Sequence, residues 1–140
     1  MRIERIAEAD TVEKGADLFD DSPLPDATAR FLISSGHHLL FAYDDGDRVI
    51  GMVSGVETTH PDKGTEMFLY ELSVIESARR RGVATALVRA LAALASERGC
   101  YGMWVGVDSD NEAALATYRR AAANDEAPAT VFSWQLSGAS

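Results

Sequence analysis

The feature that most restricts the fold is a strand-like segment joined to an amphipathic segment by a short arginine-rich connection. Residues 67–74 are rich in aromatic and branched side chains, which is typical of a central strand. Across residues 82–98 the apolar side chains recur at helical spacing, and Gly99 follows as a helix-ending residue. Residues 79–81 between them are all arginine. A strand followed directly by a helix indicates a mixed α/β fold.

The rest of the chain extends this alternation, and we expect one domain spanning residues 1–140. The expected strands span residues 2–7, 39–43, 48–57, 67–74, 101–107 and 130–136, and the expected helices span residues 10–19, 26–33, 82–98 and 111–121. Acidic residues and a glycine at 44–47 provide turn chemistry for a hairpin. The order of elements predicts a mixed α/β sandwich in which the strand at 130–136 is the closing one.

Composition excludes several classes of function. The net charge of −9 argues against nucleic-acid binding, which relies on basic surfaces, whereas it permits a cationic substrate. The alternative is that the acidity only keeps the protein soluble. Cys100 is the single cysteine, so no internal disulfide can form. No apolar run is long enough to cross a membrane and no signal peptide is apparent, so we expect a cytoplasmic protein.

The arginine-rich connection has the chemistry of an anion site. The first N–H groups of a helix lack internal partners and carry partial positive charge, and Gly82 permits close approach of a phosphate. The alternative is a solvated basic helix start, but arginines there oppose the helix dipole, which favours the anion site. The glycine patterns of phosphate loops and of dinucleotide-binding folds are both missing.

Two motifs carry a resemblance to a known family. The pattern Arg79-x-x-Gly82-x-Ala84 resembles the [QR]-x-x-G-x-[GA] signature of the GNAT acetyltransferase superfamily, and Asn111-x-x-Ala114-x-x-x-Tyr118 is similar to its second hallmark. The resemblance implies a twisted, mostly antiparallel sheet that is splayed between its fourth and fifth strands. It also implies acetyl-CoA as co-substrate, with no metal. The residues it assigns to acetyl-CoA are Leu72, Ser73, Val74, Arg79, Arg80, Arg81, Gly82, Val83, Ala84, Thr85, Asn111, Ala114 and Tyr118.

The resemblance also implies roles in catalysis. A bulge near Ser73 and Val74 would free backbone groups for the pantetheine arm, and Tyr118 would protonate the departing thiolate. The alternative for Tyr118 is a packing role on an amphipathic helix. Glu71 is the leading candidate for the base that accepts the proton of the amine, with Asp108 second; Glu71 acting only as a ligand for a cationic substrate is equally consistent with the sequence.

A narrower resemblance concerns the acceptor. Residues 66–74, 79–87 and 131–136 are similar to the gentamicin-type aminoglycoside 3-N-acetyltransferases, enzymes of antibiotic resistance. We therefore expect a cationic primary amine as acceptor, held by Glu71, Asp108 and Asp110. The alternatives are another amine, such as a polyamine, a protein lysine or a protein N-terminus, and a non-catalytic acyl-CoA-binding module. A homodimer is possible. The family's glycine-bearing turn after Tyr118 is replaced here by a helix-like continuation.

Other reactive residues fit these roles less well. His37 and His38 begin an expected strand without carboxylates at metal-ligand spacing, so we expect them to be structural. Cys100 follows a helix-ending glycine without a nearby histidine, which argues against a nucleophile.

Overall fold

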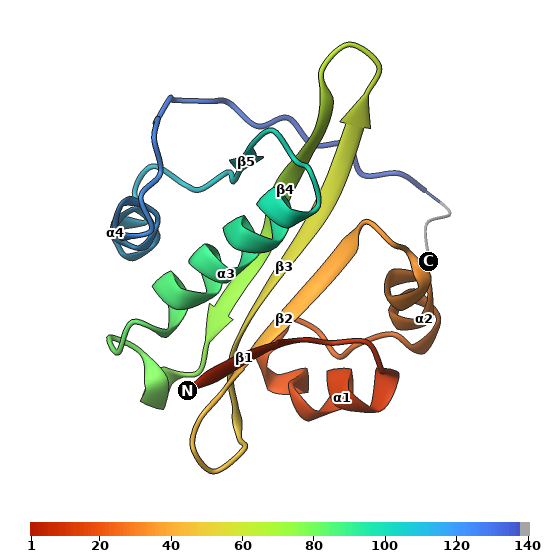
Figure 1. Ribbon diagram of the computed structural model, residues 1–140, viewed down its shortest axis with the longest axis vertical. Helices are drawn as coiled ribbons and strands as arrows, with labels where there is room; N and C mark the ends of the chain where they lie inside the picture. Colours follow the sequence, from red (N-terminus) through yellow and green to blue (C-terminus); the bar gives the residue numbers. More distant parts are fainter. Residues whose placement is uncertain (138–140) are drawn as a thin grey trace.

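A five-stranded sheet forms the centre of the computed structural model, which describes residues 1–137 (Figure 1). The strands lie in the order of the chain: β1 (Arg2–Arg5), β2 (His37–Tyr43), β3 (Val49–His60), β4 (Gly64–Val74) and β5 (Met103–Trp104). The first four strands pair in antiparallel fashion, and β4 pairs with β5 in parallel. The predicted mixed fold with a mostly antiparallel sheet is confirmed.

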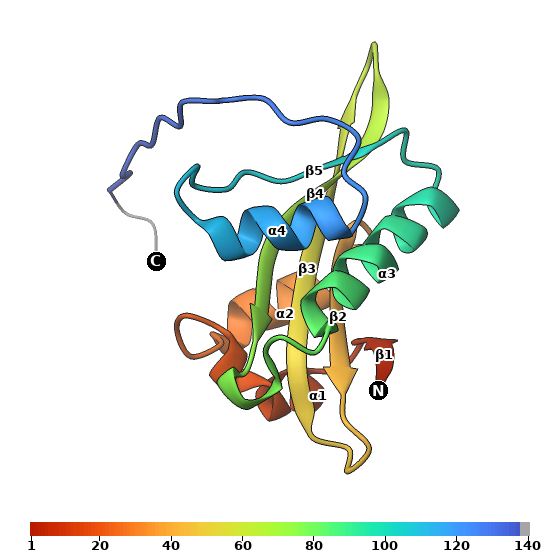
Figure 2. The same ribbon diagram turned by 90° about the vertical axis from the view of Figure 1, so that its left-hand side faces the viewer.

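Helices cover both faces of this sheet (Figure 2). The helices are α1 (Ala9–Lys14), α2 (Pro25–Ile33), α3 (Val83–Glu97) and α4 (Glu112–Arg120), with 3-10 turns at η1 (Ala16–Leu18) and η2 (Glu76–Ala78). On one face α1 and α2 enclose a core around Phe41 and Met52. On the other face α3 packs over Met67, Leu69 and Val53, with α4 beside it. In residues 1–137 no helix is long and apolar enough to cross a bilayer.

The approach of α3 to β3 depends on two glycines. A Cβ atom at Gly51 would lie 3.0 Å from side-chain atoms of Val83 and Leu87. A Cβ atom at Gly55 would lie 2.8 Å from the Met67 sulfur and 2.9 Å from Leu91. A side chain at either glycine would displace these neighbouring side chains, so both glycines allow α3 to lie close to the sheet.

Three expected elements differ in the structure. The helix predicted at 10–19 is interrupted at Gly15, where the backbone packs so closely on the Phe41 ring that a Cβ atom would lie 2.5 Å from it. The strand predicted at 101–107 is reduced to Met103–Trp104. The prediction of a strand at 130–136 was wrong. Residues 124–137 contain no helix or strand, and their backbone makes no hydrogen bond to the backbone of residues 1–123. Alternating apolar residues favour a strand, but a strand exists only where another strand pairs with it.

A buried histidine connects the far end of α3 to the sheet. His38 is 1% exposed, and its Nε2 lies 2.6 Å from Glu57 Oε2, while Arg5 Nε donates to its Nδ1 at 3.1 Å. Arg98, after the end of α3, donates to the same Glu57 oxygen at 2.7 Å. Because Arg5 requires an acceptor at Nδ1, this network holds the neutral imidazole with its proton on Nε2. His38 is thus structural, as expected.

The network predicts a pH-dependent stability. Burial lowers the pKa of His38, against the opposing effect of Glu57. The unfolded chain then binds this proton more readily than the folded chain. Stability should be full above the unfolded histidine pKa of about 6.5 and should fall as the pH decreases below it, toward the folded-state pKa. Urea unfolding measured at several pH values should show this slope in wild type and a flatter one in His38→Gln; equal slopes in the two proteins would contradict it.

Candidate active site

The pairing of β4 with β5 is short. Its register joins Met67 to Met103 and Phe68 to Trp104, and β5 then ends while β4 continues to Val74. The second half of β4 consequently has a ladder partner only on its β3 side. This is the separation between the fourth and fifth strands that the GNAT resemblance implied.

A bulge in β4 stands at the start of this separation. Ser54 of β3 is opposite Glu71, whereas the next residue, Gly55, is opposite Leu69, so Tyr70 is the extra residue. The bulge was predicted near Ser73 and Val74. That position was wrong, because the extra residue lies earlier in β4, at Tyr70. Its position matters because the inserted residue resets which side chains of β4 face which layer.

Beyond the bulge, two backbone amides of β4 point to the open edge. Ile75 N donates to the Ile50 carbonyl at 3.0 Å and Glu71 N donates to Ser54 Oγ at 3.2 Å, so both amides face β3. Amides along a strand alternate in direction, which turns the N–H groups of Leu72 and Val74 away from β3, toward the side that β5 has left. The Ser73 amide, in contrast, faces β3.

The start of α3 provides a second group of free amides. Gly82 is the N-cap, in the left-handed conformation with φ of 79°, and Arg80 also has a positive φ, of 63°. No side chain caps the helix, and its first intrahelical bond runs from Ala86 N to the Gly82 carbonyl. In the described chain the amides of Val83, Ala84 and Thr85 therefore have no protein acceptor.

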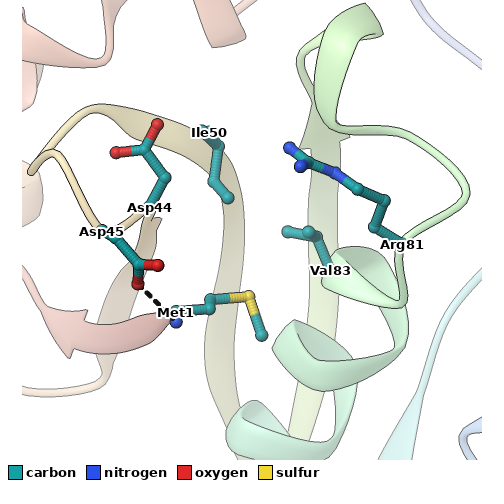
Figure 3. A pocket seen from close by; sticks show the side chains of 6 residues that line it. All are labelled: Met1, Asp44, Asp45, Ile50, Arg81 and Val83. Carbon is teal, nitrogen blue, oxygen red and sulfur yellow. Dashed lines mark ion pairs between the residues drawn. The ribbon is translucent and has the colours of Figure 1, made fainter.

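The three arginines before α3 have different positions. All are exposed, and Arg79 Nε donates to the Val74 carbonyl at 3.1 Å, which attaches the connection to the end of β4. Arg81 extends into a hollow of about 200 Å³ beside the β2–β3 hairpin, together with Ile50 and Val83 (Figure 3). None of the residues that line this hollow belongs to β4, β5 or α4.

Helix α4 brings Tyr118 to the same face as α3. Asn111 is its N-cap, and the Asn111 side-chain oxygen accepts from Ala114 N at 3.1 Å. Arg89 of α3 donates to the carbonyl of Arg120 at 2.7 Å and so ties the end of α4 to α3. Tyr118 packs against the apolar core under α3, as do Leu72 and Val74. Burial raises the pKa of its hydroxyl, so Tyr118 remains protonated and able to donate at neutral pH.

Glu71 lies on the opposite face of β4. Because Leu72 and Val74 pack under α3, the alternation of the strand directs Glu71 and Ser73 to the face of α1 and α2. Burial raises the pKa of the Glu71 carboxyl, and the negative charge of Asp20 raises it further. Asp20 was not among the residues predicted from the sequence. It lies in the loop between η1 and α2, and only the folded chain brings it near β4.

The other predicted carboxylates have different surroundings. Asp108 and Asp110 are exposed in the loop that precedes α4, where their carbonyl groups accept from Asn111 N and Glu112 N. Cys100 is partly buried, and burial raises the pKa of its thiol, which disfavours the thiolate.

Comparison with known proteins identifies the family. The family model described as acetyltransferase (GNAT) family matches residues 3–122. The chain belongs to the GNAT acetyltransferase family. Members of this family use acetyl-CoA, the co-substrate that the resemblance implied. A relative in Schizosaccharomyces pombe, N-alpha-acetyltransferase 30, is 28% identical over 91 residues, which are 65% of this chain. The matched region covers 61% of the length of that relative.

Solved structures share the fold at low sequence identity. An aminoglycoside acetyltransferase from an uncultured soil metagenomic sample, in complex with sisomicin, superimposes with a TM-score of 0.86 at 19% identity, covering 96% of this chain and 95% of that one. AAC(6')-Iy, in complex with a bisubstrate analogue built on CoA, gives a TM-score of 0.80 at 18% identity, covering 96% and 98%. An aminoglycoside 6'-N-acetyltransferase from Acinetobacter haemolyticus gives 0.76 at 23% identity, covering 97% and 99%.

The left-handed conformation of Gly82 gives a stability prediction. A Cβ atom there would meet no other atom within 4 Å, so the cost of Gly82→Ala comes only from φ, and should be about 1–2 kcal/mol of unfolding free energy. Gly82→Asn should cost less, because asparagine tolerates this conformation. Gly102→Ala is the matched control, since a Cβ atom at Gly102 also meets nothing and its φ is not positive. Urea unfolding measures both free energies. Equal losses in Gly82→Ala and Gly102→Ala would contradict the left-handed conformation of Gly82.

Proposed function

We propose that this chain transfers the acetyl group of acetyl-CoA to a primary amine of an aminoglycoside. The proposal rests on one observation: at the end of β4, groups that suit an anion and groups that suit a cation lie on different sides of the strand. The start of α3 and Tyr118 lie on the α3 side of the sheet, the free amides of Leu72 and Val74 point to the open edge of β4, and the Glu71 side chain faces the α1–α2 layer. One strand thus separates a region suited to an anionic thioester from a region suited to a cation.

The residues before and within α3 fit the anionic part of coenzyme A. Unpaired amides at the helix start and the exposed guanidinium groups of residues 79–81 are donors for phosphate oxygens. One of the two free β4 amides, Leu72 N or Val74 N, fits an amide group of the pantetheine arm, which would add to the open edge of β4 like a strand. Asn111 Oδ1 is already engaged by Ala114 N, so only the side-chain amide hydrogens of Asn111 are free for this arm.

The chemistry assigned to the protein is positioning and proton transfer. Coenzyme A, when bound, supplies the acetyl group as a thioester. A β4 amide at Leu72 or Val74 donates to the carbonyl oxygen, where negative charge develops as the amine nitrogen attacks. The C–S bond breaks as the C–N bond forms, and the Tyr118 hydroxyl donates its proton to the sulfur. Glu71 accepts the proton that the amine loses, directly or through one water molecule.

An aminoglycoside suits the acceptor side because such molecules carry several ammonium groups. The negative charge of Asp20 acts on the Glu71 carboxyl, and a bound cation would offset this repulsion. Asp108 and Asp110 are exposed and can pair with further ammonium groups. The sisomicin complex of a similarly folded protein supports the class of acceptor. We propose the 3-amino group as the site of transfer, from the resemblance of residues 66–74 and 79–87; two of the similar folds are named for the 6' position.

A protein N-terminus is the second candidate acceptor. The similarity to N-alpha-acetyltransferase 30 supports it, since that relative is named for acetylation of an α-amine. A peptide amine presents one charge beside an uncharged backbone, whereas Glu71 with Asp20 favours several charges together.

The deciding experiment is thiol release from acetyl-CoA with a panel of amines. Gentamicin, sisomicin, spermidine and peptides with free N-termini should be compared at equal concentration, and product mass spectra should locate the acetyl group. We expect the aminoglycosides to give the highest kcat/KM, with modification at the 3-amino position. Modification at the 6' position would correct the site of transfer, and a preference for peptides would replace the aminoglycoside proposal.

Tyr118→Phe tests the general acid. The substitution preserves the packing of the ring and removes only the hydroxyl, so turnover should fall by about 10²- to 10⁴-fold with little change in acetyl-CoA affinity. Tyr70→Phe is a matched control, because Tyr70 is a largely exposed tyrosine of β4. Full turnover in Tyr118→Phe, with chemistry established as the slow step, would leave Tyr118 a packing role only.

The acid side of the pH–rate profile tests Glu71. Because its pKa is raised, the active carboxylate form is lost as the pH falls through a value above that of an ordinary glutamate. Asp20→Asn removes one cause of the shift and should move this acid limb to lower pH. Glu71→Gln should abolish the limb and reduce kcat by about 10²-fold or more if Glu71 is the base. A raised acceptor KM with unchanged kcat would instead assign Glu71 to substrate binding. Asp110→Asn is the control that should leave the limb in place.

A further inference from the structure

Three aromatic side chains form a cluster on the face of β4 and β5 that lies opposite α3. Met67 and Leu69 are fully buried under α3, so Phe68 between them points to the other face of the sheet. Trp104 lies on this same face, because its ring centroid is 4.4 Å from that of Phe68. The ring of Tyr70 stands edge-on to Phe68, at a centroid distance of 5.9 Å. Phe68 therefore packs against both of the other rings and holds them in place.

The other two rings of this cluster are open to solvent. Tyr70 is 65% exposed and Trp104 is 50% exposed, whereas Phe68 is partly buried. The core beneath α1 and α2 takes its strand residues from β2 and β3, and within residues 1–137 none of its buried members comes from β4 or β5. Figure 1 shows both helices near β1 and β2 and away from β5. Adjacent aromatic rings that remain exposed on a sheet face are typical of a binding surface.

The chain segments that carry these rings have charges of one sign. Residues 64–74 and 100–110 contain no lysine or arginine. They contain four carboxylates, at Glu66, Glu71, Asp108 and Asp110. Glu71 follows Tyr70 directly, and its side chain faces the same side of the sheet as Phe68. Because aromatic faces attract cations as carboxylates do, this surface suits a ligand that is both cationic and cyclic.

Amino-substituted sugar and cyclitol rings have the matching shape and charge. Such a ring carries C–H groups on its faces and ammonium groups at its rim, so it can pack on an aromatic side chain while an ammonium group pairs with a carboxylate. We propose that Tyr70 and Trp104, supported by Phe68, hold an amino-substituted ring of the acceptor with its ammonium groups toward Glu71. This inference rests on the proposed function, and it names the residues that select a cyclic acceptor over a linear polyamine.

Removal of each exposed ring tests the proposal by steady-state kinetics. Tyr70→Leu and Trp104→Leu should each raise the KM of gentamicin by about 3- to 10-fold, because each removes one aromatic face from a cationic ligand. The KM of acetyl-CoA should stay unchanged, and the KM of spermidine should rise less than that of gentamicin. Tyr70→Phe and Trp104→Phe keep an aromatic face at each position and should restore the KM of gentamicin.

Tyr101→Leu is the matched control. Tyr101 is also exposed, but its hydroxyl donates to Glu66 at 3.0 Å, and within residues 1–137 its ring stacks on none of the three. Transfer to gentamicin with a wild-type KM in both leucine variants overturns the inference and leaves the proposed function standing. An equal rise in the KM of acetyl-CoA or of spermidine also overturns it, because the effect would then not concern a cyclic acceptor. Absence of transfer to every aminoglycoside overturns the proposed function and this inference together.

Tryptophan fluorescence gives a measurement that does not depend on turnover. Trp104 and Trp134 are the two tryptophans, so Trp134→Phe leaves Trp104 as the only reporter. Gentamicin added in the presence of coenzyme A, which has no acetyl group to transfer, should change the Trp104 emission in a saturable way. Calorimetry of the same mixture measures binding independently, and binding without a change in emission overturns the position proposed beside Trp104. Urea unfolding of each leucine variant should remain close to wild type, because both rings are exposed.

Discussion

The packing of α3 against β3 is the contact on which the rest of the structure depends. Gly51 and Gly55 remove the side chains that would hold the helix away, and Leu87 and Leu91 are fully buried in the space that results. Once α3 is fixed at this height, the position of its first turn relative to the end of β4 follows from the short connection through η2. The hydrogen bond from Arg79 to the Val74 carbonyl fixes the same relation from the other side. The uncapped amides of α3 and the free amides of β4 are thereby positioned by ordinary core packing.

The bulge at Tyr70 then determines which chemistry each face of β4 carries. Without the extra residue, the side chains after it would exchange faces, and Glu71 would point into the apolar layer under α3. With it, Leu72 and Val74 complete that layer, and Glu71 with Ser73 is directed to the α1–α2 side. A single inserted residue thus directs Glu71 to the face of β4 opposite the layer that contains Tyr118. In the proposed mechanism, Tyr118 as acid and Glu71 as base cannot then neutralise each other directly, which is a condition for both to act in one transfer.

The parts of the fold that were predictable are those governed by local pattern. The helix from Gly82 and the strand ending at Val74 were predicted because their apolar periodicity is long and consistent. Gly82 also marks the start of the helix, because few residues other than glycine adopt its left-handed conformation. The position of the bulge was not predictable, because it depends on the register in which β4 pairs with β3. No residue type in β4 marks that register. Asp20 was missed for a related reason: its proximity to Glu71 depends on how α1 and α2 lie on the sheet. The strand predicted at 130–136 is not formed. Alternation of apolar residues indicates that one face of a segment is apolar, but it does not show which strand would pair with that segment.

The strong negative charge of the chain conflicts with binding an anionic co-substrate, and the structure resolves this by location. At physiological ionic strength exposed charges are screened over about 8 Å, so the distant carboxylates of the surface contribute little at the start of α3. What acts there is local: residues 79–81 are arginines, the amides of α3 are uncapped, and no acidic residue occupies the first turn. On the proposed acceptor side, burial is the larger cause of the raised pKa of Glu71, and the nearby charge of Asp20 adds to it. Net charge therefore describes how the protein attracts cations from solution. The proposed positions of the two substrates follow from the order of charges along β4 and α3.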